Sequence, residues 1–336
     1  MIDAHAVNLG PYGLLLVNLT LLSMIGWALW KTERNLSSQS DMIVLFLLGV
    51  FAVSGRILLE PIPFLDSYRI VFRNGSYVAS LSDLPVAESV VCAPLGEVDA
   101  DFQNEYHKAE WVGAMNASYH QGGLFLKVSK NTVLDRPIVV HHLTDGQDIA
   151  SFPRHYITLE EGAKAEVVIW SSATENSSGM CNGLLEAHVA PNAYLVIDKV
   201  CNEGGEVFKF SHEQINQARD SRVKINTFTI KGHWVRNELE IVSNGAGTGS
   251  VFNGAYMPTG SEHVDNHTTM DHAHPNGTSS ELYRGIMYDK STGVFNGKVF
   301  VRQDAQQTNA FQQNSNIVVI LVVTLMTTLD VTFKEV

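Results

Sequence analysis

Histidines and carboxylates are concentrated in residues 262–285, which read EHVDNHTTMDHAHPNGTSSELYRG. The histidines of this stretch are His263, His267, His272 and His274, and Glu262, Asp265 and Asp271 lie among them. Imidazole binds iron and zinc, and a carboxylate adds an oxygen ligand or orients the ring. On an extended strand, His272 and His274 would point to the same side. We therefore consider His263, His267 and His272 as candidate metal ligands.

The same stretch also has a structural interpretation, which we favour. Pro275 and Gly277 oppose a helix, and the neighbouring sequence is rich in β-forming residues. Buried polar groups need hydrogen-bond partners. The histidines and carboxylates would then cap turns and bond between neighbouring strands. The pair His141–His142 lies beside a Thr-Asp-Gly turn, where we expect contact with solvent.

The three cysteines are Cys92, Cys181 and Cys201, and none belongs to a CxxC pair. Their number and spacing indicate neither a disulfide framework nor a preformed zinc site, so we expect a reducing compartment. As thiolates, Cys181 and Cys201 could bind iron. A single cysteine in a strand is more often a small buried apolar residue. Cys201 joins the three histidines as a candidate metal ligand.

Other chemistry is opposed by the sequence. Residues 261–266, SEHVDN, contain the residue types of a hydrolase triad, but neither triad geometry nor an oxyanion hole is indicated. The chain contains no GxxxxGK[ST] stretch, so we do not expect it to bind ATP itself. A net charge of −12 without basic runs opposes nucleic-acid binding. We expect no catalytic residues.

Apolar runs lie near both ends of the chain. Residues 12–30 are uncharged and close to the length of about 20 residues that crosses a bilayer, and shorter runs occupy 42–55 and 317–329. The first two could form a membrane hairpin, buried helices, or segments outside the fold. Asp3 stands where a secretory signal would be basic, and no clear cleavage site follows.

The centre of the chain is predicted to be β structure. Asn74–Gly75 separates two strand-like runs in residues 67–80, which predicts a hairpin, and residues 100–119 are compatible with a helix. Beyond Gly122, five segments share a corner-like pattern, in which Gly, Asn or Asp precedes a small residue: VSKNT (128–132), LEEGA (159–163), VAPNA (189–193), VSNGA (242–246) and VRQDA (301–305). The first three lie about 30 residues apart, and the later gaps are about twice as long. This pattern indicates a β-helix or a sandwich.

Three long segments, 217–241, 263–287 and 293–316, closely resemble the SufB/SufD family, on the SufD side. Residues 65–85 and 124–140 resemble it as well, so the resemblance runs in order from 65 to 316. It implies a right-handed parallel β-helix. We therefore expect a mainly β chain with four parts: an apolar, helical segment (1–60), a hairpin and helix region (61–120), the β-helix (121–316) and an apolar tail (317–336).

The resemblance also implies a function. SufD-like proteins are non-catalytic scaffold subunits of SUF iron–sulfur cluster assembly. They pair with a SufB-like subunit through their β-helices and bind the ABC-type ATPase SufC through a C-terminal helical region. The nascent cluster is thought to form transiently at the subunit interface. We therefore expect a cytoplasmic, non-membrane protein without a stably bound cofactor.

The residues that carry the resemblance fall within these matched segments. They are Arg219, Asp220, Ser221, Arg236, Asn237, Asp265, Asn266, His267, Asp271, His272, Tyr283, Gly285, Phe295, Asn296 and Gly297. After Asn316 the family pattern would continue into a segment with an interface histidine and a cysteine, and then into helices. This chain has IVVILVVTLMTTLDVTFKEV instead. We expect a truncated or frame-disrupted chain in which the SufC-binding region is missing, rather than a membrane-anchored variant.

Two other functions compete with this one. A β-helix carbohydrate-active enzyme would need a calcium-binding acidic cluster and a catalytic Arg or Lys on one face. Arg219, Arg222 and Arg236 are present, but paired carboxylates do not stand out beside them in the sequence. A membrane-anchored surface solenoid would take the apolar runs as anchors.

Overall fold

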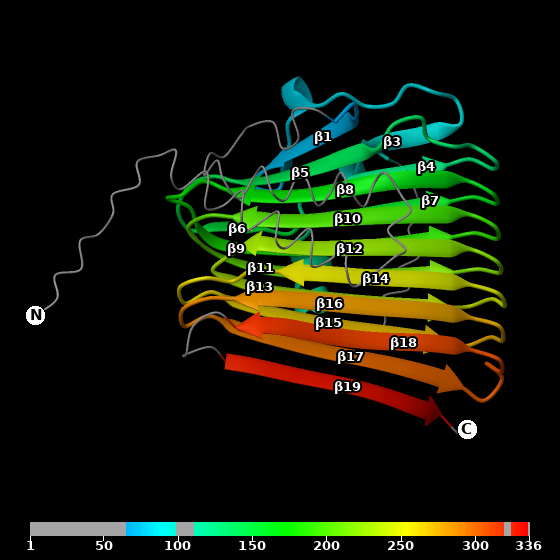
Figure 1. Ribbon diagram of the computed structural model, residues 1–336. Helices are drawn as coiled ribbons and strands as arrows, with labels where there is room; N and C mark the ends of the chain where they lie inside the picture. Colours follow the sequence, from blue (N-terminus) through cyan, green and yellow to red (C-terminus); the bar gives the residue numbers. More distant parts are fainter. Residues whose placement is uncertain (1–64, 99–110, 319–323, 335–336) are drawn as a thin grey trace, which may run out of the picture. The chain divides into compact units, whose positions relative to one another are not determined.

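The computed structural model describes residues 65–98, 111–318 and 324–334. These residues are mainly β and wind into a solenoid of about seven turns (Figure 1). Successive strands alternate between two sheets, and most neighbouring strands within a sheet run parallel. The predicted β-solenoid is therefore confirmed, and the alternative of an antiparallel sandwich is wrong.

The two sheets are stacked strand by strand along the solenoid. In order along the chain, sheet A contains β1 (Tyr68–Arg73), β2 (Ser76–Tyr77), β5 (Ile138–Thr144), β8 (Lys164–Ala173), β10 (Tyr194–Glu203), β12 (Arg222–Lys231), β14 (Gly249–Tyr256), β16 (Thr278–Met287) and β18 (Asn309–Val318). Sheet B contains β3 (Val90–Pro94), β4 (Leu124–Val128), β7 (Arg154–Leu159), β9 (Ser178–Val189), β11 (Glu206–Gln217), β13 (Trp234–Ser243), β15 (His263–His272), β17 (Thr292–Arg302) and β19 (Thr324–Lys334), and the short β6 (Ile149–Ser151) pairs with β9. Antiparallel pairing joins β1 to β2 and β3 to β4, at the N-terminal end.

The hairpin predicted at Asn74–Gly75 is present. Both residues have positive φ, 51° for Asn74 and 82° for Gly75, which a two-residue hairpin turn requires. Arg73 and Ser76 are paired across the turn.

The corners that follow the sheet-B strands share one backbone conformation. Each holds a residue with positive φ, and these residues recur every 27 to 31 positions: Asn131, Gly162, Asn192, Asp220, Gly247, Asn276 and Gln307. Asn, Asp and Gly tolerate this region better than other residues do. The corners lie on the right-hand side of Figure 1. The later gaps in the sequence repeat are twice as long because the five predicted segments do not include the corners at Asp220 and Asn276.

These corners are joined by a column of backbone hydrogen bonds. The N–H of Asn131 donates to the carbonyl oxygen of Glu161 at 2.9 Å, and the N–H of Gly162 donates to that of Pro191 at 3.0 Å. The same bond recurs from Asn276 to Gln306 at 2.9 Å. The left-handed conformation directs each N–H toward the next corner, which is why a few residue types repeat there.

A helix covers part of the outer face of sheet B. Residues 100–119 were predicted to be helical, and the described part forms α3 (Trp111–Tyr119). The wholly buried Asn116 donates to the carbonyl oxygens of Pro153 at 3.0 Å and Asn182 at 2.8 Å. The side chain of Asn182, on β9, donates to the carbonyl oxygen of Val112 at 2.8 Å. The two asparagines therefore fix α3 to the sheet.

The described parts of the C-terminal apolar run belong to the solenoid. It was predicted to be a tail, but β18 continues to Val318, and β19 pairs with β17 from Thr292–Thr324 to Arg302–Lys334. The apolar runs at 12–30 and 42–55, and the whole of segment 1–60, lie outside the described residues. Among the residues that the structure describes, no helix has the length and apolarity needed to cross a membrane.

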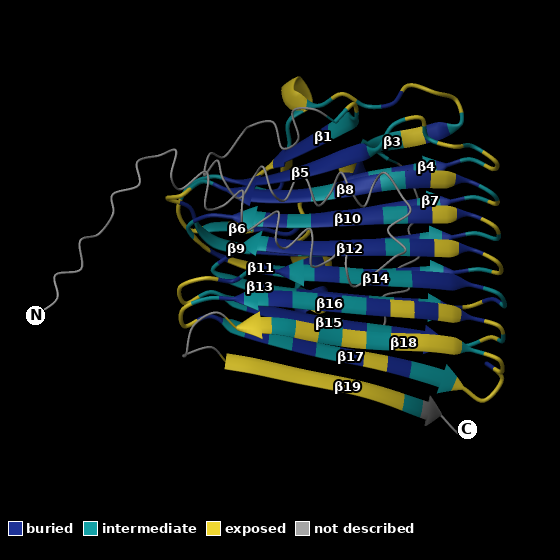
Figure 2. Cartoon of the chain, viewed as in Figure 1, coloured by how far each residue is buried: buried dark blue, intermediate teal, exposed yellow. Residues whose placement is uncertain are grey.

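Burial changes along the stack of coils. The central strands are buried on their inward faces, whereas β18 and β19 are mostly exposed (Figure 2). Within the described residues, β18 and β19 are the last strands of their sheets and have a neighbour on one side only. In the described part of the chain, the edge of these two strands is therefore open.

Candidate functional site in the polar half of the core

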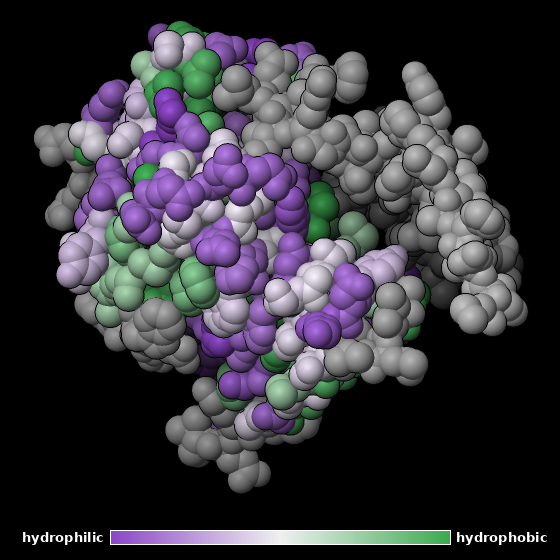
Figure 3. Space-filling view, turned by 90° about the vertical axis from the view of Figure 1, so that its left-hand side faces the viewer, coloured by the Kyte–Doolittle hydropathy of each residue, from purple (hydrophilic) through white to green (hydrophobic). Residues whose placement is uncertain are grey.

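Inward-facing side chains divide the core into two halves. Strands of sheet A run toward the left-hand corners of Figure 1, and strands of sheet B begin there. On the opposite side the interior is apolar, with residues such as Ile197, Leu185 and Ile215. Toward the left-hand corners it is polar, and we call these side chains the polar half: Ser171, Cys181, Lys199, Cys201, Glu203, Lys209, Ser211, Glu213, Thr227, Thr229 and Asn237. On the outside of these corners, hydrophilic residues cover most of the described surface (Figure 3).

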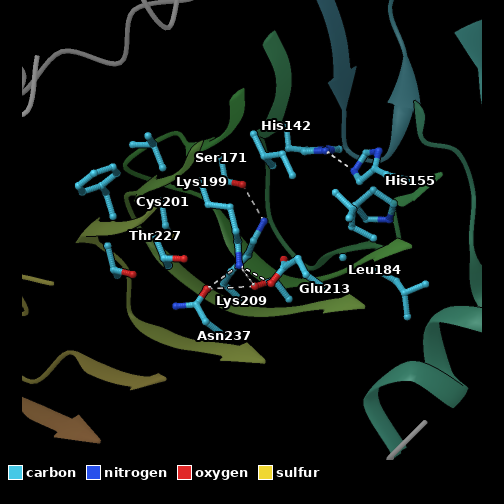
Figure 4. Close-up of a pocket in the computed structure, with 18 residues that line it drawn as sticks. His142, His155, Ser171, Leu184, Lys199, Cys201, Lys209, Glu213, Thr227 and Asn237 are labelled. Carbon is cyan, nitrogen blue, oxygen red and sulfur yellow. Dashed lines mark hydrogen bonds and ion pairs between the residues drawn. The ribbon is translucent and has the colours of Figure 1, made fainter. Parts of the chain in front are cut away.

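Lys199 links three strands at the centre of the polar half. Its Nζ lies 2.7 Å from Oε2 of Glu213, 2.9 Å from Oγ of Ser211 and 3.3 Å from Oδ1 of Asn237 (Figure 4). Burial lowers the pKa of Lys199, and the Glu213 carboxylate opposes that shift. Three acceptors match the three N–H bonds of an ammonium group. This geometry supports a charged Lys199 in a closed ion pair.

Lys209 occupies a second cationic position beside both buried thiols. Its Nζ lies 2.8 Å from Oγ of Ser171, 3.3 Å from Sγ of Cys181 and 3.4 Å from Oε1 of Glu203. Although burial acts to lower it, the pKa of Lys209 is raised above its usual value by its thiol and carboxyl neighbours. Burial raises the pKa of Cys201, which keeps that thiol protonated. A protonated thiol is a poor metal ligand, and the Lys209 ammonium already provides the positive charge here.

Two histidines form the N-terminal boundary of the polar half. The Nε2 atoms of His142 and His155 are 3.0 Å apart, and the backbone N–H of Leu124 donates to Nδ1 of His155 at 3.0 Å. His155 therefore carries its proton on Nε2 and donates it to His142. Burial lowers the pKa of His155 to about 3 and holds that of His142 well below its usual range. Phe72 stacks on His142 with ring centroids 5.3 Å apart.

The expectation that His141 and His142 are solvated is wrong. Both are buried, with exposed fractions of 1% and 6%. His142 faces the core, whereas Nε2 of His141 lies 2.8 Å from Oγ of Ser172. The adjacent turn suggested solvent, but β5 carries this pair inside the fold.

A tyrosine closes the polar half on its C-terminal side. Tyr283 lies across Gly254, where an added Cβ would come within 2.1 Å of the ring. Its hydroxyl reaches Thr227 by a hydrogen bond, and burial raises the pKa of the phenol above its usual value. Gly254 is needed because only a residue without a side chain lets the ring cross β14.

The histidine-rich stretch is divided between the two sides of sheet B. His263 faces outward and stacks on Trp234, with ring centroids 5.2 Å apart. His267 also faces outward, where its Nε2 lies 2.9 Å from Oδ1 of Asp265. His272 faces inward at the far end of β15 and lies 3.0 Å from Oγ of Ser279. These histidines and Cys201 are therefore not brought together. Within the described ranges, no group of three His, Cys, Asp or Glu side chains has an arrangement that could hold a metal ion.

The outward residues of this stretch belong to a charged network on sheet B. Arg236 donates to Asp265 at 2.8 Å and to Glu238 at 2.8 Å, and His212 lies 3.3 Å from Glu238. Burial acts to raise the pKa of Glu238, but hydrogen bonds from His212 and Arg236 outweigh it and bring the pKa to about 2. The network ties β11, β13 and β15 together from outside.

The residues that carried the resemblance have three locations. Arg219, Asp220 and Ser221 form a corner, where Asp220 has a φ of 58° and Ser221 donates to the carbonyl oxygen of Ala218 at 2.7 Å. The inward set comprises Asn237, Asn266, His272, Tyr283, Gly285, Phe295 and Gly297, and the outward set comprises Arg236, Asp265, His267, Asp271 and Asn296. Asp271 accepts two bonds from Arg302, at 2.9 and 2.7 Å. These contacts hold the corners and strands of the solenoid in place.

Sequence reasoning missed the ionised residues of the polar half. Lys199 follows Leu195 and Ile197 at two-residue intervals, and Cys201 and Glu203 continue that side of β10. This alternation is a usable signal, because it places a lysine and a glutamate in phase with buried aliphatic residues. It was overlooked because charged residues in strands usually face solvent.

A family model described as SUF system FeS cluster assembly, SufBD core domain, matches residues 142–321. The chain belongs to the SufBD family. Residues 142–321 include both histidines of the boundary and the whole polar half. The matched region is therefore the one that contains the candidate site.

Relatives place the chain on the SufD side of the family. It is 27% identical over 259 residues to iron–sulfur cluster assembly protein SufD of Escherichia coli (strain K12), which covers 75% of this chain and 60% of that protein. It is 25% identical over 298 residues to an iron–sulfur cluster assembly SufBD family protein of Synechocystis, covering 80% of this chain and 65% of that protein. Protein ABCI7, chloroplastic, of Arabidopsis thaliana is 26% identical over 164 residues, 48% of this chain and 34% of that protein. The chain thus spans less than two thirds of the length of each of these relatives.

Proposed function

We propose that this protein is a non-catalytic scaffold subunit of SUF iron–sulfur cluster assembly in the cytoplasm, and that it pairs with a SufB-like subunit. Membership of the SufBD family supports the assembly role. The edge of β18 and β19, exposed within the described residues, supports the pairing, and it is the observation on which the proposal rests. A strand edge with unpaired backbone groups is a ready partner for another β structure.

The composition of this edge fits a protein partner. Large apolar side chains on β18 and β19 are exposed: Phe311, Ile317, Val318, Leu325, Met326, Leu329 and Val331. Exposed apolar surface of this kind usually marks an interaction site. A second β-solenoid would continue the stack of strands and cover these side chains. A cluster would then form transiently between the two subunits, with no cofactor held by this chain alone.

The scaffold role agrees with how the charged side chains are used. Lys199 and Lys209 are held by carboxylates, thiol and hydroxyl groups of the chain itself. The arginines that a carbohydrate-active enzyme would need are engaged as well. Arg222 donates to the backbone oxygens of Ser221 and Gly247, and Arg236 to Asp265 and Glu238. These arrangements support a role through surfaces rather than through bond-making groups.

The proposal is tested by co-purification with a SufB-like subunit. We expect the full chain to retain that subunit, and Met326→Lys to lose it because a charge would be buried at the joined edge. Val133→Lys is the matched control, since Val133 is also exposed but lies near the other end of the solenoid. Equal retention by the two variants would refute pairing through the edge of β18 and β19.

The SufC-like ATPase is the second proposed partner. We expect the chain to bring this ATPase down in the presence of the SufB-like subunit. Failure to recover the ATPase with the chain and the SufB-like subunit together would contradict this assignment. Iron and sulfide analysis of the chain alone and of the complex tests whether a cluster needs both subunits.

A further inference from the structure

The polar half borders a small, partly open cavity. Its volume is about 30 Å³, and its wall combines polar side chains such as Lys199, Lys209 and Thr229 with apolar ones such as Ile169, Leu185 and Phe228. Figure 4 shows this region. One water needs roughly 10 to 15 Å³ measured in this way, so the space accommodates about two water-sized molecules. Strands of both sheets contribute to its wall.

Polar atoms around the cavity lack partners within the described part of the chain. Oγ1 of Thr229, a residue with 2% exposure in the cavity wall, has no hydrogen bond. Glu203 lies outside the cavity wall; its carboxylate oxygens have no hydrogen bond either, and Oε1 lies 3.4 Å from Nζ of Lys209. Nδ2 of Asn266 is likewise unpartnered, and Asn266 is bonded to Asn237 in the wall. Buried polar groups are rarely left unpaired, so these atoms indicate a missing hydrogen-bonding partner.

The charges of the polar half determine what kind of molecule fits. Lys199 is balanced by Glu213, and Lys209 by Glu203. A charged guest would be buried without a counter-ion, which is strongly unfavourable. Within the wall itself, the guest can donate to or accept from the hydroxyl of Thr229. It is therefore a neutral molecule that donates or accepts hydrogen bonds.

We propose that the cavity is a binding site for one or two neutral, water-sized molecules hydrogen-bonded to the side chains of the polar half. In aqueous solution these molecules are water. The bound molecules provide the hydrogen-bond partner that the hydroxyl of Thr229 lacks, and they lie beside the protonated thiol of Cys201. A hydrated compartment also explains how two lysines and two glutamates can be buried together. Tyr283, seated over Gly254, separates the compartment from the C-terminal coils.

The proposal is tested by removing one hydroxyl. Thr229→Val keeps the shape of the side chain and deletes Oγ1. If a bound molecule uses that hydroxyl, the full-length variant melts at a lower temperature, with Tm reduced by roughly 2 to 4 °C. If the hydroxyl is truly unpaired, the substitution removes a penalty and Tm rises or stays the same, which would overturn the proposal. Thr229→Ser retains the hydroxyl and is the matched control.

A crystal structure of the unmodified chain provides an independent readout if Thr229→Val does not fold. We expect ordered density in the cavity within hydrogen-bond distance of Thr229. A dry cavity would overturn the proposal, whatever the melting temperatures. In crystals of Thr229→Val, the molecule that contacts residue 229 should be lost or displaced, while the ion pair of Lys199 and Glu213 remains.

Discussion

The two halves of the core stabilise the same coils by different means. In the apolar half, side chains such as Leu185, Ile215 and Ile241 are buried against one another without directional bonds. In the polar half, Lys199 has three specific acceptors on two strands. Apolar packing tolerates exchange of similar side chains, whereas a buried charge tolerates only its own partners. Apolar packing therefore makes the solenoid stable, whereas the bonds of the buried lysine fix how neighbouring strands align.

The largest effect is expected from breaking the central ion pair. Lys199→Met leaves Glu213 buried without a cation and should lower the free energy of unfolding by about 4 kcal/mol in urea denaturation. Lys164→Met is the control, because Lys164 is exposed at the start of β8. It should change stability by less than about 0.5 kcal/mol.

A double substitution at the same site tests whether Lys199 and Glu213 act as a pair. Lys199→Met combined with Glu213→Leu removes both charges and should recover most of the loss, because an apolar pair can replace a buried ion pair. If the double variant is as unstable as Lys199→Met alone, the polar half depends on hydration and hydroxyl bonds more than on charge balance.

A cavity in the apolar half should cost somewhat less. Ile215 is fully buried, and Ile215→Ala should lower the free energy of unfolding by about 3 kcal/mol. Ile215→Val should cost about 1 kcal/mol, since one methylene group is removed. No second substitution should restore stability as it does at Lys199. A loss below 1 kcal/mol for Ile215→Ala would mean that the apolar half does not carry the stability assigned to it.

Lowering the pH should change the folding stability in opposite directions through His155, near the N-terminal end of the solenoid, and Glu281, near its C-terminal end. The folded-state pKa of His155 is about 3, below the ordinary 6.5, so the unfolded chain binds more protons and stability falls as pH drops below 6.5. His142 acts in the same direction. From pH 6.5 to 5 the loss from His155 is about 1.5 kcal/mol.

Glu281 makes the opposite contribution to the pH dependence of folding stability. Burial raises its pKa from 4.5 to about 7, so its contribution is present at low pH and is lost as pH rises through that interval. The pH dependence of unfolding should therefore become flatter in His155→Gln and steeper in Glu281→Gln than in the unmodified chain. Identical pH profiles for the three proteins would contradict both assignments.

The smallest effect is expected on the outer face. His267→Ala removes a partly exposed side chain paired with Asp265 and should cost less than about 1 kcal/mol. His272→Ala removes a wholly buried ring bonded to Ser279 and should cost more. A reversed order would show that the outer network matters more than the interior contacts.

The fold was predictable because its signals are local. Corners require a left-handed residue, so Asn131, Gly162 and Asn192 mark them directly in the sequence. The hairpin at Asn74–Gly75 was predictable for the same reason, because its two turn residues have positive φ. The corner at Asp220 was missed because residues 217–221, QARDS, begin with Gln217 where the five segments begin with Val or Leu, and that omission doubled the apparent interval.

The candidate site was less predictable because it depends on which way each side chain faces. His267 and His272 are five residues apart on one strand, so they lie on opposite sides of it. The sequence gives their spacing but not which of them faces the core. Lys209 and Cys181 belong to adjacent coils, and their contact follows only from the pairing of β9 with β11.

The bonds of Lys199 also limit how the number of coils can change. They connect β10 to β11 and β13, and Asn237 passes the connection to Asn266 on β15. Repeat proteins often gain or lose whole units, because each unit contacts only its neighbours. Here duplication or deletion of a central coil would separate a lysine from its glutamate. Changes in length are therefore expected at the ends of the solenoid, and the central coils are not interchangeable.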